Sequence, residues 1–358
     1  MMFPRCLPTV ALFALALLSQ GCGKEGTEQG AVSVTEDPRA AALAAERGRA
    51  LIDQPGSSSD RRILELAIEA FEEAVAMDPS QPDYAYWAGC GYHSLDRRAE
   101  ARTHFARALE LEDSGRSQLP PLAFADARRH VGEYLYADGD LEASRAMLEE
   151  AAKMGLERYE LSFALGQVLE DQKEFKTAIE QYQLASRLRP LAPQPYYRLS
   201  ALLEIQGESE AAASMQDTFE RLSRMESDLR EAELAVETNP GDPAAHDQLA
   251  QLLFRMNRGE EALEHMQLAA RYSPDDPGVR YRLGTLFIMF QRRGEALEHL
   301  DAAAALDAEN VDVQLARSQV LVELGREDEA RQALARVLEI SPGEPRALEA
   351  LGRLGDGR

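Results

Sequence analysis

The stretch that decides the fold runs from residue 243 to residue 344. It reads PAAHDQLAQLLFRMNRGEEALEHMQLAARYSPDD (243–276), PGVRYRLGTLFIMFQRRGEALEHLDAAAALDAEN (277–310) and VDVQLARSQVLVELGREDEARQALARVLEISPGE (311–344). Each unit is 34 residues long, and no residue separates one unit from the next. A fixed period of this length indicates an array of repeated supersecondary units.

Small residues and prolines recur with this period. Alanine occurs at 262, 296 and 330 and again at 269 and 303, and proline occurs at 240, 274 and 342. This spacing resembles the tetratricopeptide repeat (TPR), a helix–turn–helix unit. The resemblance implies an all-α solenoid, a right-handed superhelix of antiparallel helix pairs whose concave groove is lined by the first helix of each pair. We expect about eight repeats and a C-terminal capping helix, because the last repeat has no neighbour to cover its apolar face.

The composition agrees with an all-α chain that does not bind nucleic acid. Good helix formers such as Ala, Leu, Glu and Arg dominate the 358 residues, and no run alternates in the way strands do. The formal net charge is -23, without a basic tract. Phosphate backbones require clustered Lys and Arg, so nucleic acid is excluded as a partner.

The N-terminus has the pattern of a bacterial lipoprotein signal peptide over residues 1–21. Arg5 precedes a 12-residue apolar segment, Leu7 to Leu18, which is shorter than the ~20 residues needed to span a bilayer. The sequence Leu18-Ser19-Gln20-Gly21-Cys22 that follows resembles a lipobox. The resemblance implies cleavage before Cys22 and acylation of Cys22, and Gly23 favours the outer membrane. We therefore expect a protein held on the periplasmic side of the outer membrane by acyl chains such as palmitate; inner-membrane anchoring and surface exposure stay open.

The rest of the chain divides by repeat. We expect a flexible tether at 22–37, an N-terminal TPR array at 38–226 with five repeats of which the first is degenerate, and an insertion from Arg116 to Phe124. No Gly or Pro occurs from 208 to 239, which predicts one long helix at about 209–238; two helices broken near 223–227 are the alternative. Its extension at 227–242 leads into the regular array at 243–344 and a capping helix and tail at 345–358.

Candidate partner-binding residues occupy the groove-facing positions of the first helices. One such position carries Tyr86, Arg129, Phe163, Tyr197, Asp247, Tyr281 and Leu315 in successive repeats. Aromatic groups supply contact area at interfaces, although tyrosine is also common at this position of the generic repeat. Adjacent positions add Arg198 and Arg282 and several acidic residues. The predicted groove set is Tyr86, Arg129, Phe163, Tyr197, Arg198, Tyr281 and Arg282.

The sequence gives no reason to expect an enzyme, a cofactor or a metal. Phosphate-loop, nucleophile-elbow and zinc motifs are missing. His104, His265 and His299 share one position of three repeats, which we expect to be exposed on the second helix, and His93, His130 and His246 are expected to lie scattered in separate repeats. Cys90 is the lone cysteine beyond Cys22, so no disulfide is expected.

The expected function is therefore that of a scaffold or adaptor. It would bind a protein or peptide partner in the groove, in envelope assembly or secretion, with no small-molecule substrate. The alternative is a recruiting or regulatory module for a separate envelope enzyme. These expectations come from the fold resemblance, which is a weak guide to a particular partner.

Overall fold

The computed structural model describes residues 37–54, 56 and 60–355. The predicted signal peptide, Cys22 and most of the predicted tether lie outside these residues. All regular structure that is described is helical, and no strand occurs within it. Among these helices, none combines the length and the apolar character needed to cross a bilayer.

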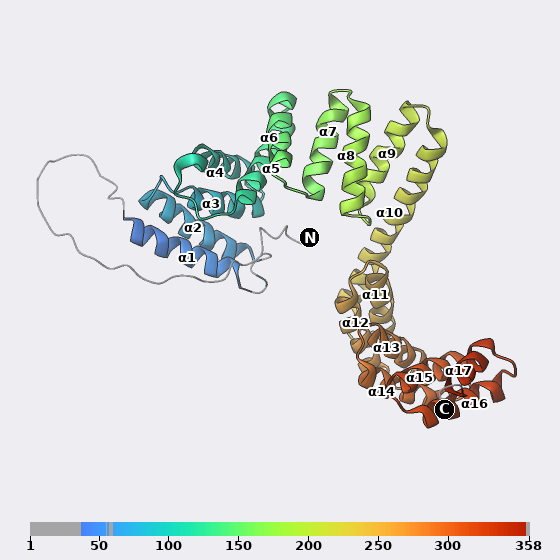
Figure 1. Ribbon diagram of the computed structural model, residues 1–358. Helices are drawn as coiled ribbons and strands as arrows, with labels where there is room; N and C mark the ends of the chain where they lie inside the picture. The colour runs from blue at the N-terminus through green and yellow to red at the C-terminus, as the bar shows by residue number, and fades with distance from the viewer. Residues whose placement is uncertain (1–36, 55, 57–59, 356–358) are drawn as a thin grey trace, which may run out of the picture. The chain divides into compact units, whose positions relative to one another are not determined.

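The chain divides into two compact units, 1–216 and 217–358. In the first unit, helices follow one another in the order shown in Figure 1: α1 (Pro38–Ile52), α2 (Arg61–Met77), α3 (Pro82–Ser94), α4 (Arg98–Glu110), α5 (Pro121–Ala137), α6 (Leu141–Lys153), α7 (Tyr159–Asp171), α8 (Phe175–Leu188) and α9 (Pro193–Ile205). The second unit contains α11 (Pro243–Arg255), α12 (Gly259–Tyr272), α13 (Pro277–Met289), α14 (Arg293–Leu306), α15 (Val311–Glu323), α16 (Glu327–Ile340) and α17 (Pro345–Gly355).

In the first unit α1, α3, α5 and α7 each pack on the helix that follows, and α9 packs on α8. In the second unit α11, α13 and α15 each pack on the helix that follows, and within each unit every pair packs on the next. Within both units the contacts therefore join neighbours in sequence, which is the defining property of a solenoid. The pairs α11–α12, α13–α14 and α15–α16 coincide with the three 34-residue units of the sequence, and α17 covers the last pair as predicted.

One continuous helix, α10 (Ser209–Thr238), spans the segment that lacks Gly and Pro. The structure confirms one helix and contradicts the two-helix alternative. Its start packs in the first unit, where Ala212 joins the cluster around Leu199 and Leu202. Its end packs in the second unit, where Leu229 and Ala232 join a cluster with α11. The division between the compact units falls inside this helix, after residue 216.

The insertion before the third repeat is shorter as a loop than predicted. Its last four residues, 121–124, form the first turn of α5, because Pro121 has the backbone geometry of a helix N1 position. The remaining loop bonds to the preceding repeat. Ser117 Oγ donates to Asp83 Oδ1 at 2.6 Å, and Arg116 Nη2 donates to Asp78 Oδ2 at 2.8 Å. The insertion thereby donates hydrogen bonds to two buried carboxylates, those of Asp83 in α3 and of Asp78 directly after α2.

Glycine permits the two helices of a repeat to approach closely. A Cβ atom at Gly284 would lie 2.8 Å from Leu300 Cγ and 3.3 Å from the Ala296 carbonyl oxygen, so a larger residue there would push α13 away from α14. Ala296 and Leu300 are fully buried beneath it. The predicted role of Gly284 and Ala296 in close packing is confirmed.

The turn between the two helices requires left-handed backbone. Gly325 has φ 73° and follows α15. Its N–H donates to Val322 C=O at 2.9 Å, and Arg326 N–H donates to Leu321 C=O at 2.8 Å. This pair of bonds is a Schellman motif, which satisfies two carbonyls at the helix end and favours glycine at the left-handed position.

Replacement of Gly325 by Ala should destabilise the second unit by about 1 kcal/mol, because an L side chain is strained at positive φ. The matched control is Gly294→Ala in α14, where φ is helical and no atom lies within 4 Å of the added methyl group. That change should be neutral or stabilising. Urea denaturation of both variants measures the difference, and equal stabilities would contradict the assigned turn.

Candidate binding surfaces

The first helices of the repeats carry the residues predicted to face a partner. We call the surface that they form the first-helix face; it comprises α3, α5, α7 and α9 in the first unit and α11, α13 and α15 in the second. Helices α5 and α7 contact each other directly, as do α13 and α15, so these pairs of first helices form a continuous surface.

Tyr86 is not available to a partner, contrary to prediction. Its side chain is 1% exposed and packs between Trp87 and Phe105, with ring centroids 5.3 and 5.9 Å away. Its hydroxyl donates to Asp126 Oδ2 at 3.4 Å. The aromatic residue at this position of the second repeat is therefore a core residue.

Arg129 is also buried, which corrects a second predicted binding residue. Its guanidinium donates to Asp126 Oδ1 at 3.0 Å and to Glu133 Oε1 at 2.6 Å. Asp126 accepts a further ion pair from Arg158 at 3.4 Å. Burial acts to lower the pKa of Arg129, but the carboxylates of Glu133 and Asp126 outweigh burial and raise it. Arg129 thus neutralises the buried carboxylate of Asp126 and the half-buried carboxylate of Glu133 in α5 and does not face a ligand.

His130 completes this buried cluster. Arg129 Nη2 lies 2.7 Å from His130 Nε2 and can only donate, so the imidazole proton lies on Nδ1. Within the described residues, one buried side-chain nitrogen or oxygen atom has no hydrogen-bond partner, and that atom is His130 Nδ1. Burial, followed by the positive charge of Arg129, lowers the pKa of His130 well below its ordinary value. Burial raises the pKa of Glu133, and the charge of Arg129 opposes that rise.

His93 on α3 and His130 on α5 belong to separate repeats, as predicted, but their rings lie together and are not scattered. Their ring centroids are 4.1 Å apart, and His130 stacks on Phe105 at 4.8 Å. His93 Nδ1 lies 2.7 Å from the Tyr134 hydroxyl. Burial, and then Arg129, lowers the pKa of His93 to about 4. The signal in the sequence was their shared location on first helices of consecutive repeats.

The fifth repeat presents the most accessible predicted residue. Tyr197 on α9 is 51% exposed, and Ile205 near the end of the same helix is 63% exposed. Arg198 Nη1 forms an ion pair with Glu170 Oε1 of α7 at 3.3 Å. Phe163 is half-buried and stacks on Tyr159 with ring centroids 5.7 Å apart. Among the predicted groove residues of this unit, Tyr197 is therefore the exposed one, and Arg198 is half-buried.

The second unit carries two of the predicted groove residues. Tyr281 and Arg282 on α13 are half-buried. Arg282 binds the carboxylate of Asp247 on α11 in bidentate fashion, Nε to Oδ1 at 2.7 Å and Nη2 to Oδ2 at 2.8 Å. Planar two-point pairing of this kind fixes both side chains. Arg282 therefore links neighbouring first helices and offers a partner only its remaining donors.

The three second-helix histidines are half-buried, not exposed as predicted. His104 Nε2 lies 2.9 Å from Glu72 of the preceding repeat, and His265 Nδ1 lies 2.9 Å from His246 Nδ1. His299 Nδ1 lies 3.2 Å from Arg280 Nη1. Each thus contacts a neighbouring helix. In the described part of the chain, no three His, Cys, Asp or Glu residues are grouped so as to hold a metal ion.

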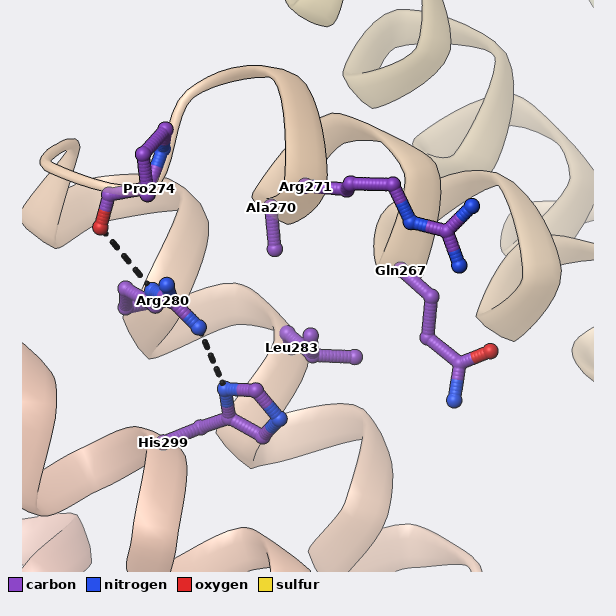
Figure 2. Close-up of a pocket in the computed structure, with 7 residues that line it drawn as sticks. All are labelled: Gln267, Ala270, Arg271, Pro274, Arg280, Leu283 and His299. Carbon is purple, nitrogen blue, oxygen red and sulfur yellow. Dashed lines mark hydrogen bonds between the residues drawn. The ribbon is translucent and has the colours of Figure 1, made fainter.

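A pocket of about 440 Å³ lies near His299 in the second unit. Figure 2 shows its residues: Gln267, Ala270 and Arg271 of α12, Pro274 of the turn, Arg280 and Leu283 of α13, and His299 of α14. The sequence did not indicate this pocket, because its residues come from three helices and match no motif.

The pKa of His93 predicts acid sensitivity of the first unit. Unfolded histidine binds its proton near pH 6.5, whereas native His93 does so near pH 4, so the unfolded state holds more protons between these values. The free energy of unfolding should therefore fall by about 3 kcal/mol from this residue alone as the pH drops from about 6.5 to 4. His130 adds to the loss in the same direction.

Trp87, the single tryptophan, lies in the first unit and reports its unfolding by fluorescence. The test compares urea denaturation of the parent chain and His93→Gln at several pH values. The variant should show a shallower decline below pH 6.5, even if it is less stable at pH 7.5. Parallel declines in both proteins would contradict the assignment.

Two parts of the chain match family models described as "Tetratricopeptide repeat": residues 131–194 and residues 287–354. The first match covers α6, α7 and α8, and the second covers α14, α15 and α16. No curated protein matches the chain.

Several solved structures are similar to the chain at low sequence identity. One is YrrB, titled a TPR protein with an unusual peptide-binding site, at 18% identity over 57% of this chain and 97% of YrrB, with a TM-score of 0.30. Another is pilF of Pseudomonas aeruginosa, at 17% over 64% of this chain and 97% of pilF, with a TM-score of 0.30. Yeast Tom70 is similar at 15% over 91% of this chain and 66% of Tom70, with a TM-score of 0.36. With the matched segments and the repeated helix pairs, the fold is an all-α solenoid of tetratricopeptide repeats.

Proposed function

We propose that the protein is a scaffold that binds a protein partner on its first-helix face while acylated Cys22 tethers it to the outer membrane on the periplasmic side. Proteins with tetratricopeptide repeats generally serve in protein interactions. The observation that carries the proposal is the exposed Tyr197 on α9, at a repeat position whose counterpart Tyr86 is buried. The role that we assign is binding, not catalysis.

Apolar groups on the first-helix face support a protein partner in the first unit. Tyr197 and Ile205 leave large apolar surface in water, and its burial by a partner is favourable at about 25 cal/mol per Å². A tyrosine adds a hydroxyl that can bond to the partner. The Arg198–Glu170 pair borders this surface and supplies polar groups at its edge.

The second unit presents a row of apolar side chains at one repeat position. Phe254, Ile288 and Val322 are 34 residues apart on α11, α13 and α15, and each is at least partly exposed. Met289, next to Ile288, is 62% exposed. A row that follows the direction of the repeats suits an extended or helical segment, because such a segment places side chains at regular intervals.

The proposal of a membrane tether rests on the sequence Leu18 to Cys22, which lies outside the described residues. A net charge of -23 disfavours adsorption of the folded repeats to anionic lipid. Acyl chains on Cys22 would provide the attachment instead, and two or more chains anchor a protein far more stably than one. Assembly or secretion in the envelope is the setting in which such a tethered scaffold would act.

Site-specific photocrosslinking in cells tests the binding face. A photoreactive residue in place of Tyr197 or Tyr281 should yield protein crosslinks, because both positions lie on the first-helix face. The matched control is Tyr272 of α12, an exposed tyrosine on a second helix. Adding Ile205→Asp should reduce the yield from position 197. Crosslinks from position 272 alone would overturn the assignment.

Membrane attachment is tested separately by Cys22→Ala, with Cys90→Ala as the matched control, since Cys90 is a buried cysteine of α3. Cys22→Ala should move the protein from the membrane to the soluble fraction, because no acyl acceptor remains. Cys90→Ala should stay with the membrane. Retention of the Cys22 variant would refute the tether and leave the binding face untouched.

A further inference from the structure

The residues that line the pocket beside His299 are not among the predicted groove residues, although Arg280 and Leu283 lie on α13. Its walls come from α12, the turn at Pro274, α13 and α14, and all its residues lie within the second unit. The buried side chains of Ala270 and Leu283 form an apolar floor between two polar walls (Figure 2). Its volume of about 440 Å³ lies within the range of small-molecule sites, about 300–1,000 Å³.

One wall holds two fixed donors. Arg280 Nε donates to the Pro274 carbonyl oxygen at 3.0 Å, and Arg280 Nη1 donates to His299 Nδ1 at 3.2 Å. Arginine cannot accept a hydrogen bond, so His299 Nδ1 is the acceptor and its proton lies on Nε2. Burial and then the charge of Arg280 lower the pKa of His299, which favours the neutral imidazole. The remaining guanidinium N–H groups and the His299 Nε2–H are left as donors.

The opposite wall carries Gln267 and Arg271. They lie four residues apart on α12, and therefore on one face of the helix, and both are exposed. Figure 2 shows them across the apolar floor from Arg280 and His299. Arg271 also lies in the last turn of α12, where a cation stabilises the helix dipole.

The charge of the pocket contrasts with that of the chain. The lining includes two arginines and no carboxylate, although the net charge of the chain is -23. Among the described ion pairs, neither Arg271 nor Arg280 has a carboxylate partner. In the same unit Arg258, Arg292 and Arg326 each bind a glutamate three residues later. The positive charges of the two pocket arginines are thus not paired with a carboxylate among the described ion pairs.

We propose that this pocket binds a small organic dicarboxylate with an aliphatic middle. One carboxylate would accept hydrogen bonds from Arg280 and His299, the other from Arg271 and Gln267, and the aliphatic part would lie on Ala270 and Leu283. Arginine suits this role because its fork of N–H groups matches a carboxylate. Arg280 is already held by two hydrogen bonds, so its ordering costs little on binding.

The test uses the full-length Cys22→Ala chain and titration calorimetry with glutarate and adipate. At least one should bind with a dissociation constant below about 10 mM, and Arg280→Gln or Arg271→Gln should weaken it about tenfold or more. Arg280→Gln is expected to fold, because Gln314 occupies the same position in the next repeat. The matched control is Arg255→Gln, an exposed arginine of α11 outside the pocket, which should bind as the parent does.

Two further probes test the assignment of both walls. The diamide of the bound acid should not bind, because it lacks charge. The corresponding monocarboxylate should bind more weakly, because it can occupy only one wall. If it binds beside Arg280, Arg271→Gln should not change its affinity. If it binds beside Arg271, Arg280→Gln should not change its affinity. Absence of dicarboxylate binding, or binding that neither pocket variant weakens, would overturn the proposal. This result is independent of the first-helix face, which the crosslinking experiment examines.

Discussion

The close approach of the two helices within each repeat is the constraint on which the rest of the structure depends. At Gly284 there is no room for a side chain above Leu300, and at Gly166 the ring of Tyr182 occupies the same space at 2.6 Å from a Cβ position. Close contact inside the pair fixes which side chains remain on its outer surfaces. Those surfaces then bury apolar area only against neighbouring pairs. The first-helix face and the pocket near His299 both follow from this arrangement.

The 34-residue period of the sequence predicted the fold because the same contacts between helices recur once in each period. Alanines at 262, 296 and 330 are all fully buried, so their spacing reported real helix contacts. The absence of Gly and Pro from 208 to 239 predicted α10 for an equally local reason, since nothing in that segment interrupts helical hydrogen bonds. Features that arise within one or two helices were therefore accessible from sequence.

The candidate site was predicted only in part, because side chains at the same repeat position have different environments in different repeats. Tyr197 is exposed, whereas Tyr86 at the same position is buried beneath Asp126 and Trp87. Tyr86 contacts Trp87 and Phe105 of its own repeat and also Asp126 of α5, which belongs to a buried charged cluster. Breaking such a cluster by removing one partner leaves an uncompensated buried charge, which typically costs about 3–5 kcal/mol. Such contacts between repeats depend on pairs of residues, so the residue type at a single position does not predict them.

The sequential contacts of the helices have a consequence for how the chain acquires its structure. Most contacts of the helices from α1 to α9 are with the next or the preceding helix, or with the helix after that, and the same holds from α11 to α17. The contact order is low, so folding does not require the two ends of the chain to meet. A chain delivered N-terminus first can close α1 on α2 and α3 on α4 while later residues are still absent. Apolar surface is then covered progressively, and at each stage only the newest repeat exposes an uncovered face.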